Sequence, residues 1–244
     1  MIRVIAALTF RALAGRRRSL LVVLLGALPV LVALLVRASG RTSGLDAVTH
    51  TILDRLVIST LVPIVGLVFG TAALGAELDD GTAIYLLTKP IDRWRIVAAK
   101  VAVAAGLAVA ATAPAAFVAA ALLANGGSAI LAAVGYAIGA AVAAALYATV
   151  FLALSLITGR ALAIGLIYVL LWEGILSGLF EGTRTFSIRQ YALGIADAIG
   201  GGTRAASGDV LAGSSAVVLA AVVAVLALAL AVRRLQAFEV READ

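Results

Sequence analysis

Apolar residues fall in six long runs along the chain, separated by short polar segments. The runs cover Ser19–Val36, Leu56–Ala76, Val101–Ala124, Ile130–Ile157, Ala161–Phe180 and Leu211–Val232. Each is close to the ~20 residues that a helix needs to cross a ~30 Å hydrocarbon layer. Backbone groups in lipid must bond within their own segment, and the runs lack the short alternation of barrel strands. The pattern predicts an all-α membrane protein with six transmembrane helices in one domain, residues 1–244.

The distribution of basic residues predicts the orientation. Thirteen of the 19 Lys and Arg residues fall on the side that carries both termini, and six fall on the other side. Lys and Arg are enriched in cytoplasmic loops, so we expect a multi-pass protein of the inner (plasma) membrane with both termini cytoplasmic. The short connections Asn125–Ala129 and Thr158–Arg160 predict that the third, fourth and fifth helices are antiparallel neighbours.

The residues before the first run form a separate amphipathic element. One broad helical face holds Ile2, Ile5, Leu8, Ala12 and Leu13. Arg3 and Arg11 lie opposite, which predicts a helix in the plane of the inner headgroup layer, with Arg16–Arg18 at anionic lipid. An ordinary basic leader is the alternative. A cleaved signal peptide is a further alternative, although the first run is longer than the usual 7–15-residue apolar region.

Composition supports the membrane class and excludes several kinds of chemistry. Of the 244 residues, 64% are hydrophobic and 13% are charged, which leaves too little polar surface for a soluble protein. The net charge of +6 follows from the excess of basic residues on one side rather than from nucleic-acid binding. Cysteine is absent and His50 is the single histidine, so no Cys or His metal cluster and no Ser-His pair can form in the membrane.

The chain also lacks the G-x-x-x-x-G-K-[ST] phosphate loop, because Lys89 and Lys100 follow Thr88 and Ala99 rather than glycine. We therefore expect no catalytic residue, metal or cofactor on this chain. Any driving energy has to come from a partner subunit or from an ion gradient.

Ion-coupled carriers keep ionisable residues in their spans, and Glu173 is the one acid within the six runs, since every Asp is expected in a loop or at a terminus. Glu173, beside Trp172, is a candidate substrate-pathway residue. The interpretation we favour is an interfacial carboxylate that reaches lipid headgroups or pairs with an outer arginine.

Charge is concentrated between the second and third runs, at Glu77, Asp79, Asp80, Lys89, Asp92, Arg93, Arg95 and Lys100. Asp79 or Asp80 can cap a short helix, because a carboxylate accepts hydrogen bonds from free N–H groups at a helix start. Pro90 ends that helix, and Asp92 caps the helix that enters the third run. This predicts a short amphipathic helix across the cytoplasmic face, with apolar Ile84, Leu86 and Leu87 available to dock a soluble partner. An ordinary basic loop is the alternative.

This segment resembles the corresponding loop of type-2 ABC exporter permeases. Those proteins show a Glu before Gly-Thr, a Leu-Leu pair, Pro-Ile/Val-x-Arg and a later Lys. The matching positions here are Glu77, Gly81-Thr82, Leu86-Leu87, Pro90-Ile91, Arg93 and Lys100. The six-run layout, the amphipathic N-terminus and the long segment before the last run extend the resemblance over the whole chain.

The resemblance implies the permease subunit of an ATP-driven exporter, paired with a second permease as a homo- or heterodimer around the substrate pathway. A separate nucleotide-binding ATPase, which carries the ATP and Mg, would dock on a coupling segment made of Glu77, Asp79, Asp80, Gly81, Thr82, Ile84, Tyr85, Leu86, Leu87, Lys89, Pro90 and Arg93. An ion-coupled secondary carrier or channel is the main alternative, and a membrane anchor or assembly factor is another. The substrate stays open.

The segment Glu181–Val210, between the last two runs, has an apolar helical face made of Ile188, Tyr191, Ala192, Ile195 and Ile199. It predicts a short outer helix, either a lid over the exit or a plain surface helix. Gly200–Gly202 predicts a turn after it. Three G-x-x-x-G spacings, at Gly66, Gly135 and Gly174, allow close helix packing, but such spacings also arise by chance among 24 glycines.

Overall fold

The computed structural model describes residues 2–13, 15–40, 45–79, 92–123, 129–176 and 185–241, and these contain helices and no strand. The helices are α1 (Ile2–Leu13), α2 (Arg16–Ala38), α3 (Leu45–His50), the π-helical η1 (Thr51–Leu61), α4 (Val62–Asp79), α6 (Arg93–Leu123), α7 (Ala129–Ser155), α8 (Ala161–Ile167), the π-helical η2 (Tyr168–Leu176), α10 (Ile188–Gly200), α11 (Thr203–Ala206) and α12 (Gly213–Arg241).

Four helical stretches of the described chain are long and apolar enough to cross a membrane: Val48–Gly75, Arg93–Leu123, Ala129–Ser155 and Gly213–Ala237. The first and fifth predicted runs coincide with shorter apolar helices, Val22–Ala38 and Ala161–Gly174. The all-helical membrane class is therefore confirmed, while the count of six spans stays a prediction.

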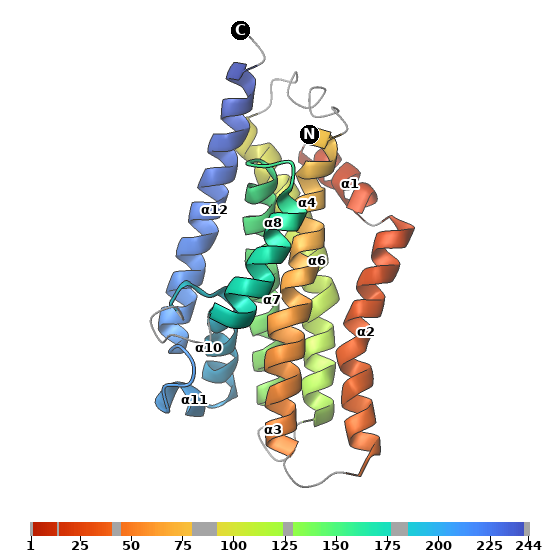
Figure 1. Ribbon diagram of the computed structural model, residues 1–244, viewed down its shortest axis with the longest axis vertical. Coiled ribbons are helices and arrows are strands. Elements are labelled where there is room, and N and C mark those ends of the chain that lie inside the picture. The colour runs from red at the N-terminus through yellow and green to blue at the C-terminus, as the bar shows by residue number, and fades with distance from the viewer. Residues whose placement is uncertain are drawn as a thin grey trace.

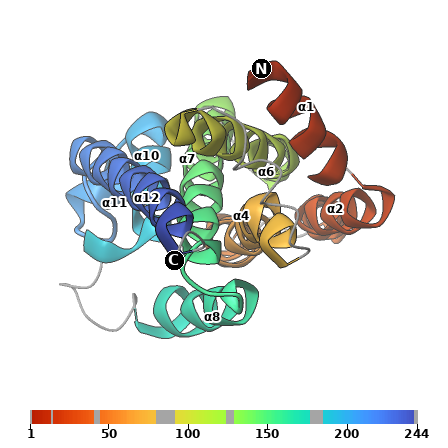
Figure 2. The same ribbon diagram turned by 90° about the horizontal axis from the view of Figure 1, so that it is seen from above.

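The helix α7 forms the centre of the bundle and contacts α4, α6, α8, α10 and α12 (Figure 2). The helices α6 and α7 pack along each other, and α8 turns back beside α7, as the short connections predict. Both ends of the described chain lie at one end of the molecule (Figure 1). We call the end with α1 and the last turns of α12 the proximal end, and the end with α3 and α11 the distal end.

Glycines set the closest helix contacts in the bundle. A methyl group at Gly66 would lie 2.5 Å from the Tyr147 Cβ, and one at Gly70 would lie 2.6 Å from the carbonyl oxygen of Ala148. These distances leave no room for a side chain, so α4 packs directly on the backbone of α7. Gly135 and Gly139 form a second close contact, against the backbone of α10. Two of the three G-x-x-x-G spacings therefore mark close packing, as membrane helices use it.

The N-terminal segment is helical, as predicted, and part of it is buried against the bundle. Ile5, Thr9 and Leu13 are buried, and α1 packs against α6. Leu8, on the predicted apolar face, is 61% exposed and does not pack on the bundle. Thr9 can be buried because its hydroxyl donates to the Ile5 carbonyl oxygen at 2.9 Å. The position of α1 in a headgroup layer stays a prediction.

The predicted outer helix is present as α10, at the distal end (Figure 1). Its apolar face is buried against α7 and α12, with Tyr191 only 2% exposed. The choice between a lid and a plain surface helix stays a prediction. The chain turns after α10 at Gly201 and Gly202, whose φ values of +130° and +72° favour glycine. The predicted turn is confirmed.

Candidate functional site

Most of the predicted coupling segment lies outside the described residues. This applies to Asp80, Gly81, Thr82, Ile84, Tyr85, Leu86, Leu87, Lys89 and Pro90. Its two flanks are described: Glu77 and Asp79 belong to the last turn of α4, and Arg93 begins α6 directly after Asp92. Both flanks lie at the proximal end (Figure 1), so α4 and α6 bring the two ends of the segment to one face of the bundle.

Lys100, the last position of the resemblance, joins these two helices. Its side chain is 1% exposed, and its Nζ donates a hydrogen bond to the Ala73 carbonyl oxygen at 2.9 Å. Burying an ammonium group is unfavourable unless hydrogen bonds replace its hydration shell. The contact lies about two turns from each flank of the coupling segment, so α4 and α6 are fastened together at its base.

The start of α6 presents an exposed aromatic and charged surface. Trp94 is 55% exposed, and the Arg95 guanidinium lies 5.4 Å from the centre of its ring. The Arg95 Nε lies 3.0 Å from the Asp92 carboxylate. Tryptophan and arginine are enriched among the residues that dominate protein interfaces, so this surface suits contact with a partner beside the coupling segment.

Glu173, the candidate pathway residue, is fully buried at the end of η2. Its Oε2 accepts a hydrogen bond from the Ser187 hydroxyl at 2.6 Å, and its Oε1 accepts from the backbone N–H of Ile188 at 3.0 Å. The Tyr168 hydroxyl donates to the same Oε1 at 3.3 Å. Ser187 is in turn the N-cap of α10. The carboxylate therefore holds the start of α10, where free N–H groups favour negative charge.

The Glu173 side chain is buried and does not face lipid headgroups, while its pairing with an outer arginine stays a prediction. The α10 helix folds back against the bundle and covers the position, and this contact is not visible in the pattern of the fifth run alone. Burial and the negative charge of Glu173 raise the pKa of Tyr191, whose hydroxyl donates to the Thr185 carbonyl oxygen at 2.6 Å. The part of Glu173 in a substrate pathway stays a prediction.

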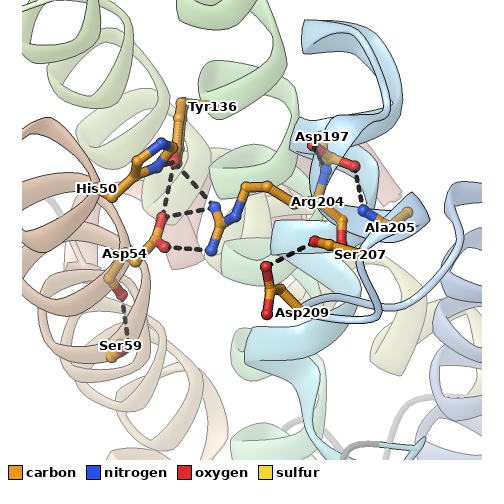
Figure 3. Close-up of polar contacts among 9 residues, drawn as sticks. All are labelled: His50, Asp54, Ser59, Tyr136, Asp197, Arg204, Ala205, Ser207 and Asp209. Carbon is orange, nitrogen blue, oxygen red and sulfur yellow. Dashed lines mark hydrogen bonds and ion pairs between the residues drawn. The ribbon is translucent and has the colours of Figure 1, made fainter. Parts of the chain in front are cut away.

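A second buried carboxylate, Asp54, forms a polar cluster at the distal end (Figure 3). Asp54 Oδ2 lies 2.7 Å from Arg204 Nη2, in an ion pair between η1 and α11. The Tyr136 hydroxyl, from α7, donates to Asp54 Oδ1 at 2.7 Å. His50 Nδ1 lies 3.2 Å from that hydroxyl. Four residues from three parts of the chain thus meet at one point.

Arg204 is positioned by its own backbone as well as by its charge. The Asp197 carboxylate, near the end of α10, accepts hydrogen bonds from the backbone N–H groups of Arg204 and Ala205 at 3.1 and 2.9 Å. Burial lowers the pKa of Arg204, but the hydrogen bond and the negative charge of Asp54 outweigh it and raise this pKa. The guanidinium therefore stays charged beside Asp54.

The cluster corrects two expectations from the sequence. Asp54 lies within a helix, not in a loop, because the second span begins at Val48 rather than at Leu56. Glu173 is also not the one ionisable residue in the spans, since Asp54 and Lys100 are buried there too. The adjacent charges of Asp54 and Arg55 interrupt the apolar run, so the run begins at Leu56 although the helix begins earlier. The four-residue steps from Val48 to Ile52 and Leu56 were the signal that the helix begins earlier.

The comparison with known families agrees with the resemblance of the loop. The model of the ABC-2 family transporter protein matches residues 15–179, which is more than half of the chain and includes the coupling segment, Lys100 and Glu173. No curated protein matches the sequence. With its apolar helices and this match, the chain belongs to the ABC-2 family of transporter membrane proteins.

Proposed function

We propose that this protein is the permease subunit of an ATP-driven exporter. It forms the substrate pathway with a second permease subunit, and a separate ATPase binds and hydrolyses ATP with Mg. The observation that carries the proposal is the joint placement of α4 and α6. They bring both flanks of the coupling segment to one face, and the Lys100–Ala73 hydrogen bond fastens them at its base.

The contact between Lys100 and Ala73 supports a mechanism by which movement of a bound ATPase is transmitted to the transmembrane helices. A partner that displaces the coupling segment pulls on α4 and α6 together, because the two helices share that contact. The close packing of Gly66 and Gly70 on α7 passes the displacement to the centre of the bundle. ATP binding and hydrolysis in the partner would then switch the permease between two states, each stabilised by its own contacts.

The charge distribution supports an orientation with the proximal end in the cytoplasm. The exposed Arg233 and Arg234 near the end of α12 and Arg160 in the turn before α8 lie on this side, together with the coupling segment. Basic residues favour the cytoplasmic side, which is also where an ATPase finds ATP. In this arrangement six spans cross the inner membrane and α1 lies along its cytoplasmic surface.

The test is purification of the tagged permease from its native host, followed by reconstitution in liposomes. The proposal predicts copurification of a nucleotide-binding ATPase and export that requires ATP and Mg. An ion-coupled carrier, the alternative function, would transport under an ion gradient without any ATPase. Transport of that kind, with no ATPase in the purified sample, would contradict the proposal.

A further inference from the structure

Two stretches of the transmembrane helices are π-helical, and each carries a buried carboxylate that holds the distal connection. In η1, Asp54 binds Arg204 of α11; in η2, Glu173 caps α10. π-helical turns are rare and occur frequently at functional sites. The segment between η2 and α12 therefore bonds to η2 at Ile188 and to η1 at Arg204.

The π-helical stretch η1 is followed by Pro63, which has no N–H group for the regular α-helical hydrogen bond to residue 59. Within η1, the hydroxyls of Ser59 and Thr60 donate to the carbonyl oxygens of Asp54 and Arg55, five residues earlier. The Asp54 carboxylate of this stretch meets the Arg204 guanidinium (Figure 3).

Asp54 and the coupling segment lie at opposite ends of one helix. The stretch Val48–Gly75 is continuous, carries Asp54 near its distal end and leads at its proximal end to Asp79, which flanks the coupling segment. Between them, Gly66 and Gly70 pack directly on α7. Because the helix is continuous, a displacement of the coupling segment at its proximal end is transmitted along it to Asp54.

The partner of Asp54 lies on a short helix. The helix α11 has four residues, follows Gly201 and Gly202, and is bonded to α10 through the Asp197 carboxylate. Ser207, just after it, is exposed, whereas Arg204 reaches back to η1. The ion pair is partly exposed, with 26% of the Arg204 side chain and 10% of the Asp54 side chain accessible. Glu173, by contrast, is 0% exposed.

We propose that Asp54, Tyr136 and Arg204 form a distal latch, which closes the outer end between the second span and α11 and opens in each transport cycle. The latch rests on the proposed function, because the ATPase supplies the displacement that opens it. Tyr136 donates to Asp54 from α7, so the latch joins three elements: η1, α7 and α11. His50 contacts the Tyr136 hydroxyl and keeps it turned toward Asp54.

The experiment measures the distance across the latch without changing its residues. The native chain has no cysteine, so Arg55→Cys and Ser207→Cys, both exposed on the two sides of the latch, introduce a specific spin-label pair. Distances are recorded by pulsed electron paramagnetic resonance for the permease–ATPase complex, without nucleotide and with nucleotide trapped. Ser207→Cys with Val217→Cys, a pair that does not cross the latch, is the control.

The latch predicts one short distance without nucleotide and a second, longer population with trapped nucleotide, and no change in the control pair. Asp54→Asn should enrich the longer population about tenfold without nucleotide, within the ~5–150-fold range typical of coupled sites. Equal distance distributions in all of these samples would overturn the latch.

Failure of the proposed function is recognised separately. If no ATPase binds the permease, the ATPase-driven opening is wrong. The effect of Asp54→Asn on the isolated permease then still decides whether the ion pair holds α11. If the longer population appears with nucleotide but Asp54→Asn changes nothing, the distal end moves and Asp54 does not latch it, which also overturns the inference.

Discussion

The Nζ of Lys100 donates a hydrogen bond to the carbonyl oxygen of Ala73 at 2.9 Å, and this contact joins α6 to α4 near the proximal end. It is a buried charge within an apolar bundle. Replacing a buried charge by an apolar side chain of similar size is often neutral or stabilising. We therefore expect Lys100 to take part in coupling rather than in stability.

Lys100→Met tests this role, since it keeps the length of the side chain and removes the ammonium group. We expect normal membrane insertion and an unchanged or higher midpoint of thermal unfolding. The number of substrate molecules exported per ATP hydrolysed should fall about fivefold or more, the usual size of coupling between sites. Arg234→Met, an exposed change at the same end, is the control. An unchanged transport-to-ATP ratio in Lys100→Met would show that the contact carries no coupling.

Glu173 supports α10, and its size and acceptor oxygens should matter more than its charge. Glu173→Gln loses one acceptor oxygen and should lower the free energy of unfolding by about 1–2 kcal/mol. Glu173→Ala leaves Ser187 and the Ile188 N–H without their acceptor and should cost about 3 kcal/mol. Thermal unfolding in detergent measures both values. Glu173→Gln should transport with the pH dependence of the unchanged protein; loss of both transport and pH dependence would instead favour an ion-coupled carrier.

The packing of α4 on α7 predicts that alanine substitution at two glycines, Gly70 and Gly106, changes the stability of the protein very differently. A methyl group at Gly70 meets the Ala148 carbonyl oxygen at 2.6 Å, whereas one at Gly106 has no atom within 4 Å. Gly70→Ala should therefore destabilise the protein by about 1–3 kcal/mol, because the backbone has to move. Gly106→Ala should be neutral or stabilise by up to about 1 kcal/mol through helix propensity. Equal unfolding midpoints for the two variants would contradict the close contact.

The orientation is tested by single cysteines, which have no background in a chain without cysteine. An impermeant thiol reagent applied to intact cells should label positions 125 and 207, which the predicted orientation puts outside. Positions 89 and 160, which it puts in the cytoplasm, should react only after the membrane is opened. Labelling of position 89 in intact cells would reverse the orientation.

The sequence predicts the features that depend on local pattern. The apolar runs place the helices, the step of Ile188, Tyr191 and Ile195 identifies α10, and Gly201 and Gly202 mark its turn. The loop between the second and third runs indicates the family that the comparison then shows. These features follow from hydrophobic periodicity and turn chemistry within a few residues.

The polar contacts could not be predicted in the same way, because their partners are far apart in the sequence. Asp54 and Arg204 are 150 positions apart, and Tyr136 lies 82 positions from Asp54. In the sequence, Lys100 ends a charged stretch and looks like a solvated lysine. Its burial becomes apparent only from the packing of α6 on α4. Burial of such groups depends on which helices pack together, and that packing is not encoded in a single run of residues.

The central claim is that the segment at residues 77–93 couples a separate ATPase to the membrane helices. Its most direct test is the double change of Leu86 and Leu87 to Asp, which places unpaired charge in an apolar contact. Loss of a dominant interface residue typically costs more than about 1–2 kcal/mol of binding free energy. Thr158→Asp with Arg160→Asp, in the other turn at the proximal end, provides a matched control.

Both double variants and the unchanged permease are reconstituted with the ATPase, and association is measured by copurification at equal membrane levels. We expect the Leu86/Leu87 variant to reach the membrane normally, to lose at least about tenfold in ATPase affinity, and to lose transport-linked ATP hydrolysis. The Thr158/Arg160 variant should keep both. If the Leu86/Leu87 variant binds its ATPase and transports as the unchanged protein does, this segment is not the coupling element.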